Sequence, residues 1–249
     1  MSPPPQRRRG IVTGAGSGIG KAAVLRMLHE GVDVLAVDIN PAGLIDLKKA
    51  GCETLAADIT DPEARVRLAD WAEGANYLVN SAGVIIIKPI FEVTVDDWRR
   101  VQTVNAEATF FLCQEIGPKL APQGAIVNLS SSSAKLATTI EVAAYAASKT
   151  TILSITRSFA YALASRPVRV NAILPGIVDT PMQDEVLERV APMRGITAEE
   201  LHDARTRLVP LGRGSTPEEC AGLIWFLLSD EAAYMTGQAI NFTGGLVTW

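Results

Sequence analysis

The chain has 249 residues, of which 48% are hydrophobic and 20% are charged, and its formal net charge is −4. This composition is typical of a globular protein and excludes a disordered chain. The acidic balance argues against nucleic acid as a partner, and Arg7-Arg8-Arg9 is the only basic run. No stretch approaches the ~18 apolar residues that a membrane span requires.

The cysteines and the first residues indicate a compartment. Cys52, Cys113 and Cys220 lie far apart, and no C-x-x-C pair occurs. Because the chain has only two histidines, the sequence predicts neither a disulfide framework nor a metal site. Residues 1–6 lack the apolar segment of a signal peptide. We therefore expect a cytoplasmic protein that binds no metal.

A glycine-rich turn follows the first apolar run. Residues 10–28 pass from a β-branched run through alternating glycines into a helical pattern. A strand, a glycine turn and a helix start together present backbone N–H groups to a phosphate. The spacing is Thr13-Gly14-x-x-x-Gly18-x-Gly20 rather than the common G-x-G-x-x-G. A flexible glycine loop is the alternative interpretation of this turn taken alone.

Strand and helix patterns alternate along the rest of the chain. Strand patterns follow at 32–37, 54–57, 77–79, 125–129, 168–174 and 238–242. Helix patterns lie between them at 40–50, after a proline-containing cap at 60–63, from 94 to 112, at 142–163 and after a capping box at 216–219. Residues 182–212 are polar and helical only in part. The alternation predicts a parallel sheet covered on both faces, in a single domain spanning residues 1–249.

Polar residues follow most of the predicted strands. They are residues 14–20, Asp38, Asp58, residues 80–83, residues 130–133 and residues 175–180. Ligands of an open parallel sheet bind beyond the carboxyl ends of its strands, so these segments predict one site. Asp38 lies about 20 residues beyond the glycines, the offset of a carboxylate that binds a ribose.

Two residues on the helix predicted at 142–163 form a candidate acid–base pair. Tyr145 and Lys149 are four residues apart and therefore share one helix face. A phenol is a poor base at neutral pH, and a neighbouring cation lowers its pKa toward the working range. The alternative is an ordinary Tyr/Lys pair on a solvated face. On the helix predicted from 94 to 112, Asn105 is a polar amide on an apolar stripe.

The sequence resembles the short-chain dehydrogenase/reductase family. The matching motifs are Thr13-Gly14-x-x-x-Gly18-x-Gly20, Asp58, Asn80-Ser81-Ala82-Gly83, Asn105, the serine run, Tyr145-x-x-x-Lys149, Pro175-Gly176 and Thr180. They span most of the chain in the family's order. The resemblance implies a Rossmann-type, doubly wound three-layer sandwich with a seven-stranded parallel sheet. It also implies a nicotinamide cofactor and hydride transfer between an alcohol and a carbonyl.

The resemblance implies a catalytic role for five residues. Tyr145 would take the proton of the substrate hydroxyl, and Lys149 would bind the cofactor ribose and depress the pKa of the phenol. A serine would bind the reacting oxygen. The strand register favours Ser131, whereas the family's spacing from Tyr145 gives Ser132 as the alternative. Asn105 would hold a water that relays the proton, or it is a core amide with backbone partners.

The resemblance also implies the residues that bind the cofactor. They are Gly14, Ser17, Gly18, Ile19, Gly20, Asp38, Asp58, Ile59, Asn80, Ala82, Gly83, Tyr145, Lys149, Pro175, Gly176, Ile177 and Thr180. Ser81 stands where the family has a second asparagine, and we expect little effect. The carboxylate of Asp38 would repel a 2′-phosphate, and no Arg or Lys occupies positions 15, 17, 39 or 40. We therefore predict NAD rather than NADP.

The predicted activity is NAD-dependent interconversion of a secondary alcohol, such as a polyol or sugar, and its carbonyl. Within the same family the alternative is an NAD(P)H-dependent 3-oxoacyl thioester reductase. From another class, the alternative is a catalytically idle dinucleotide-binding sensor or scaffold. Residues 182–212 correspond to the family's variable substrate lid. The family further implies a homotetramer and a small-molecule substrate whose identity the motifs do not specify.

Overall fold

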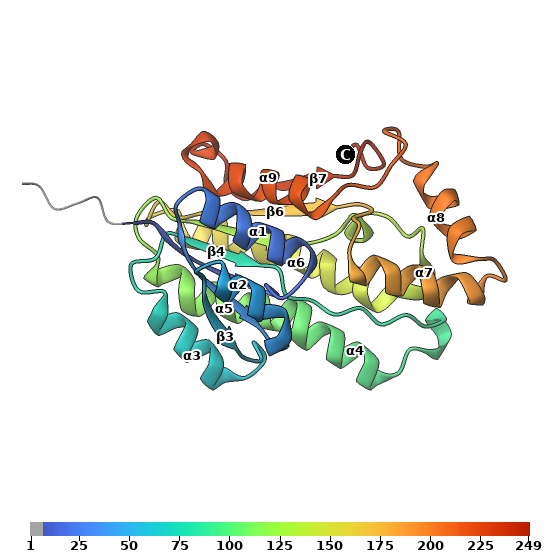
Figure 1. Ribbon diagram of the computed structural model, residues 1–249, viewed down its shortest axis with the longest axis horizontal. Helices are drawn as coiled ribbons and strands as arrows, with labels where there is room; N and C mark the ends of the chain where they lie inside the picture. The colour runs from blue at the N-terminus through green and yellow to red at the C-terminus, as the bar shows by residue number, and fades with distance from the viewer. Residues whose placement is uncertain (1–6) are drawn as a thin grey trace, which may run out of the picture.

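The computed structural model describes residues 7–249 and places seven strands in one parallel sheet (Figure 1). The strands are β1 (Arg9–Thr13), β2 (Asp33–Asp38), β3 (Glu53–Ala56), β4 (Tyr77–Asn80), β5 (Ala125–Leu129), β6 (Arg169–Pro175) and β7 (Ala239–Phe242). Their order is β3-β2-β1-β4-β5-β6-β7, so the chain reverses its direction of growth between β1 and β4. The predicted doubly wound, seven-stranded Rossmann-type sheet is confirmed.

Nine α-helices connect and cover the strands in the described part of the chain. They are α1 (Gly18–His29), α2 (Ile45–Lys49), α3 (Pro62–Trp71), α4 (Val95–Gln102), α5 (Ala108–Ile116), α6 (Ala143–Leu163), α7 (Pro181–Met193), α8 (Ala198–Thr206) and α9 (Pro217–Leu228). None of the helices within residues 7–249 combines the length and hydrophobicity needed to cross a membrane.

Two hydrophobic layers form the core on opposite faces of the sheet. On one face, α1 and α9 pack side by side, and residues such as Met27 and Leu227 are buried against the sheet. On the other face, α3, α5 and α6 bury Leu68, Leu112 and Ile155. Figure 1 shows α9 and α3 on opposite sides of the strands. Strands covered on both faces are apolar throughout, which is why their sequence patterns are continuous rather than alternating.

The helix predicted from 94 to 112 is not one regular α-helix. It consists of α4, a π-helical turn at Thr103–Glu107 and α5, and Asn105 lies inside the π turn. The side chain of Asn105 is fully buried and bonds Val84 of a neighbouring loop, so tertiary contacts accompany the irregular turn. A π turn has no distinctive pattern of apolar residues, and the spacing therefore predicted a continuous helix.

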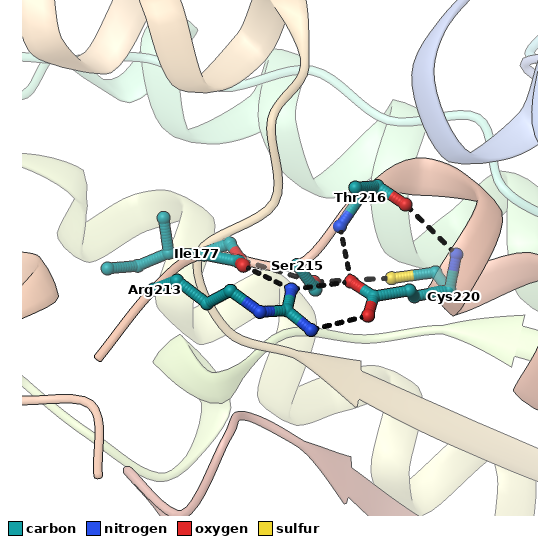
Figure 2. A network of polar contacts seen from close by, with 7 residues as sticks. Ile177, Arg213, Ser215, Thr216 and Cys220 are labelled. Carbon is teal, nitrogen blue, oxygen red and sulfur yellow. Dashed lines mark hydrogen bonds and ion pairs between the residues drawn. The ribbon is translucent and has the colours of Figure 1, made fainter. Parts of the chain in front are cut away.

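The loop between β6 and α7 is tied to the start of α9 (Figure 2). The carbonyl oxygen of Ile177 accepts hydrogen bonds from the backbone N–H and the hydroxyl of Ser215, at 2.9 and 3.2 Å. Thr216 caps α9 through a capping box with Glu219, whose carboxylate also pairs with Arg213 at 2.6 Å. These contacts fix the position of the loop that follows β6.

Candidate active site

One cavity of about 340 Å³ lies beyond the carboxyl ends of the strands. Its walls come from the loops after β1, β4, β5 and β6, from Asp38 at the end of β2 and from helices α1, α6, α7 and α8. Of the predicted site residues, those that line it are Gly14, Ser17, Gly18, Ile19, Gly20, Asp38, Ala82, Gly83, Ser131, Ser132, Tyr145, Lys149, Pro175, Gly176 and Thr180. The structure therefore brings together residues that are up to 166 positions apart, between Gly14 and Thr180.

The start of α1 presents unsatisfied backbone donors to this cavity. Helices α3, α4, α7, α8 and α9 each begin with an Asp or Thr side chain that accepts a hydrogen bond from the first turn. Ser17, at the start of α1, makes no such bond. Gly18 adopts a positive φ of 50°, which the absence of a Cβ permits. A helix start of this kind fits a phosphate group of a dinucleotide.

Asp38 lies at the end of β2 and joins two backbone segments. One oxygen of its carboxylate accepts from the N–H of Gly16 and the other from the N–H of Asn40, both at 2.8 Å. A Cβ on Gly16 would lie 2.9 Å from this carboxylate, so the turn depends on glycine there. Asp38 therefore presents a fixed negative charge to the cavity, beside the glycine turn.

A second group of cavity residues lies at α6 and just after β5. Helix α6 carries Tyr145 and Lys149, and Ser131 follows the end of β5. The ammonium group of Lys149 lies 5.5 Å from the centre of the Tyr145 ring and donates to the carbonyl of Leu129 at 2.8 Å. Burial raises the pKa of Tyr145 to about 12, and a hydrogen bond with the Ser131 side chain opposes that rise. Burial lowers the pKa of Lys149 to about 8. Burial thus raises the pKa of the phenol, opposite in direction to the lowering expected from Lys149.

The two candidate serines differ in their surroundings. Ser131 is buried, accepts a hydrogen bond from the N–H of Ser133 at 3.1 Å and contacts Tyr145. Ser132 also lines the cavity, but it begins a 3₁₀ turn and its carbonyl accepts from Lys135. The geometry therefore favours Ser131, the residue indicated by the strand register, over Ser132.

Asn105 finds its hydrogen-bond partners within the protein. Its side-chain oxygen accepts from the N–H of Val84 at 2.8 Å, and its amide donates to the Val84 carbonyl and to the hydroxyl of Ser148. A Cβ on Gly83 would lie 3.3 Å from Asn105 and 3.4 Å from Lys149, so both side chains approach the backbone of Gly83 closely. The proposed proton relay through Asn105 stays a prediction.

Four further predicted cofactor residues are not part of the cavity wall. Asp58 accepts from the backbone and hydroxyl of Thr60, and Ile59 packs into the hydrophobic layer with α3. Asn80 donates to Asn128 on the neighbouring strand at 2.8 Å, inside the sheet. The carbonyl of Ile177 is engaged by Ser215, so a contact between the Ile177 backbone and a carboxamide would have to come from its N–H.

Sequence reasoning did not assign Arg205, which lines the cavity from α8. Several arginines lie within residues 182–212, and their spacing does not show which one faces the cavity. Gln183, at the start of α7, lines the cavity as well. The apolar part of the wall includes Val142 and Val186, which belong to a buried cluster with Tyr145.

Comparisons with known proteins identify the family. A profile of the family described as enoyl-(acyl carrier protein) reductase matches residues 14–247. The 3-oxoacyl-(acyl-carrier-protein) reductase FabG of Thermotoga maritima is 35% identical, and the alignment covers 95% of this chain and 96% of that protein. Galactitol 2-dehydrogenase (L-tagatose-forming) of Cereibacter sphaeroides is also 35% identical, with coverage of 96% and 94%.

One solved structure of similar fold is a ketoreductase in complex with NADPH. An actinorhodin polyketide ketoreductase variant with NADPH superposes with a TM-score of 0.90 and 29% identity, covering 98% of each chain. The present chain therefore belongs to the short-chain dehydrogenase/reductase family. It is an oxidoreductase of the kind that acts on alcohol or carbonyl groups with a nicotinamide dinucleotide.

Proposed function

We propose that the protein is an NAD-dependent oxidoreductase that interconverts a secondary alcohol, such as a polyol or sugar, and its carbonyl. The observation that carries this proposal is one cavity lined both by Asp38 and by Ser131, Tyr145 and Lys149. Sequence identity does not indicate which substrate this chain uses, because the FabG and galactitol dehydrogenase relatives are equally similar to it. The charge of Asp38 favours NAD over the NADPH of the thioester reductase alternative.

The residues of the cavity fit a nicotinamide dinucleotide and divide its binding among three regions. Gly14–Gly20 and the uncapped start of α1 would hold the pyrophosphate, and Asp38 would accept hydrogen bonds from the adenosine ribose. Lys149 would hold the other ribose. When bound, the cofactor would supply the hydride acceptor or donor.

The remaining chemistry is a proton transfer by residues of this chain. Ser131 would bind the oxygen of the substrate, and Tyr145 would accept the hydroxyl proton during oxidation or donate it during reduction. The positive charge of Lys149 favours the phenolate that accepts the proton. Both side chains are buried in the wall of the cavity.

Residues 182–212, which include α8 and all but the first residue of α7, contribute Met182, Gln183, Val186 and Arg205 to the wall of the cavity. We assign this segment, called the α7–α8 segment below, as the substrate lid of one single-domain protomer. It packs on Ile87, Val101 and Tyr145 through Val190 and Leu201. We further propose a homotetramer, the assembly implied by the family resemblance.

The most direct test is a cofactor-reduction screen of secondary alcohols, polyols, sugars and 3-hydroxyacyl thioesters with NAD and with NADP. We expect oxidation of an alcohol with NAD as the better cofactor. Preference for a 3-hydroxyacyl thioester with NADP would instead support the reductase alternative. Binding of NADH without turnover of any substrate class would support a dinucleotide sensor.

Replacing Asp38 should change cofactor preference. In Asp38→Asn the shape of the side chain is kept while its negative charge is removed. We expect the ratio of kcat/KM for NAD to that for NADP to fall by about 10- to 100-fold, or ~1.4–2.8 kcal/mol. Asp33→Asn, at the other end of β2, is the matched control and should leave the ratio unchanged. An unchanged ratio in Asp38→Asn would show that this carboxylate does not select the cofactor.

Separate alanine substitutions distinguish the two serines. We expect Ser131→Ala to lower kcat by about 10²–10³, because it removes a hydrogen bond to the oxygen on which charge changes. Ser132→Ala should retain most of the wild-type kcat. Steady-state kinetics on the best substrate of the screen measures both variants. A larger loss in Ser132→Ala would assign the catalytic role to Ser132 instead.

A further inference from the structure

Arg205 is a cavity-lining cation without an ion-pair partner in residues 7–249. The other arginines of the α7–α8 segment are paired. Arg189 pairs with Glu185 at 2.9 Å, Arg194 with Glu141 at 2.7 Å and Arg207 with Asp203 at 3.9 Å. Arg205 is half-buried, and burial followed by repulsion from Arg194 lowers its pKa. A guanidinium stays protonated under these conditions, so the cavity contains an uncompensated positive charge.

Gln183 supplies a second unmatched donor beside Arg205. Its side-chain oxygen accepts from the guanidinium of Arg205 at 3.4 Å. Its amide nitrogen is buried and has no hydrogen-bond partner among the described residues. Buried amide donors are nearly always satisfied in folded proteins, so an unpartnered one in a cavity wall points to a ligand acceptor. Apart from the contact between them, neither side chain has an acceptor for these donors among the described residues.

The pair lies on the substrate side of the cavity. Leu201, one helical turn before Arg205 on the same face of α8, packs in the buried cluster that contains Tyr145. Asp38 is the only acidic side chain among the described residues that line the cavity, and its oxygens already accept from Gly16 and Asn40. The cavity wall therefore carries two positively charged side chains, Lys149 and Arg205, and one carboxylate, Asp38.

We propose that Arg205 and Gln183 bind an anionic group of the substrate, such as a carboxylate, sulfonate or phosphate, while Tyr145 acts on its secondary alcohol. This inference rests on the proposed function and narrows its substrate class to hydroxy compounds that carry a negative charge. A guanidinium forms two parallel hydrogen bonds with such groups, and the amide of Gln183 can add a third. Arg205 then determines specificity without taking part in the proton transfer.

The test compares alcohols in matched charged and neutral pairs. The probes are 3-hydroxybutyrate against its methyl ester, and glycerol 3-phosphate against glycerol. We expect the charged member of at least one pair to have the higher kcat/KM by about tenfold or more, the usual effect of one charge-assisted hydrogen bond. The two pairs distinguish a planar carboxylate from a phosphate. A preference for the neutral member in both pairs would overturn the inference.

Substitutions at α8 connect that preference to Arg205. In Arg205→Met the preference should disappear, through a higher KM for the charged substrate, while the KM for NAD stays unchanged. Arg205→Lys should retain part of it. Arg207→Met, two positions later and largely exposed, is the matched control and should behave as wild type. A higher KM for NAD in Arg205→Met would place the guanidinium on the cofactor instead, and an unchanged preference would remove Arg205 from substrate binding.

An activity-independent measurement separates this inference from the proposed function. Malonate or sulfate should raise the melting temperature of the wild type and of Arg207→Met above that in chloride at equal ionic strength. Arg205→Met should show a smaller increase, because only the general effect of these anions on the protein surface remains. If no alcohol is oxidised but this difference is found, the proposed function fails and the anion site remains. If alcohols are oxidised but the anions stabilise all three proteins equally, the anion site fails alone.

Discussion

Replacing Tyr145 by Phe should abolish nearly all oxidation of the best alcohol substrate. We expect kcat to fall by about 10³-fold, within the range of 10²–10⁴ that general acid–base catalysis contributes. The phenyl ring preserves the packing of Tyr145 in the buried cluster with Val142 and Val186, so the loss would be chemical. Steady-state kinetics with NAD measures the loss, and the affinity for NADH, measured by fluorescence, should change little.

Tyr161 provides the matched control on the same helix. It lies on α6, is 87% exposed and does not line the cavity, so Tyr161→Phe should retain wild-type activity. Melting temperatures of both variants establish that they are folded. Retention of full activity by Tyr145→Phe would exclude the phenol as the acid–base group and leave the family's mechanism without its central residue in this chain.

Tyr145→Phe also tests how the rate of alcohol oxidation depends on pH. Burial raises the pKa of Tyr145 to about 12, so the phenol is protonated at neutral pH. Oxidation needs the phenolate. As long as the pH is below the pKa, the phenolate fraction increases about tenfold for each unit by which the pH rises. The oxidation rate should therefore rise with pH through the neutral range, whereas reduction, which uses the protonated phenol, should not. In Tyr145→Phe the residual oxidation rate should lose this dependence.

The second large effect is expected from a methyl group at Gly20. A Cβ at this position would overlap the carbonyl oxygen of Gly14 and lie 2.8 Å from its carbonyl carbon. Those atoms are backbone, and Gly14 itself adopts a positive φ of 65° against the backbone of Ala82. The turn therefore cannot yield without moving the loops that follow β1 and β4. We expect Gly20→Ala to lower the free energy of unfolding by at least about 3 kcal/mol.

The loss should be measurable as a melting temperature lower by about 6–12 °C, together with weaker NADH binding. Gly222→Ala is the matched control, because a Cβ at Gly222 in the middle of α9 meets no atom within 4 Å. That substitution should be neutral or stabilise the protein by up to ~1 kcal/mol, the difference in helix propensity. Equal melting temperatures for the two variants would contradict the close approach of α1 to the glycine turn.

The sequence predicts site residues on strands and helices better than site residues in loops. Asp38 ends a continuous apolar run and Tyr145 and Lys149 share a helix face, so their positions follow from local periodicity. The serine was ambiguous, because strand counting and the spacing from Tyr145 disagree by one residue. The structure favours Ser131, because its side chain contacts Tyr145 and accepts a hydrogen bond from the N–H of Ser133. The sequence could not decide between the serines, because hydrogen bonds within a loop leave no periodic pattern.

By itself, the sequence determined the alternating elements, the parallel sheet and the family, because these depend on hydrophobic periodicity and on short motifs that are local in the chain. Only the tertiary structure decided the π turn around Asn105 and the cavity-facing position of Arg205. The arginines of the α7–α8 segment look equivalent in sequence. Which of them is paired, and which one lines the cavity without an ion-pair partner among the described residues, depends on how α8 packs through Leu201 against distant residues.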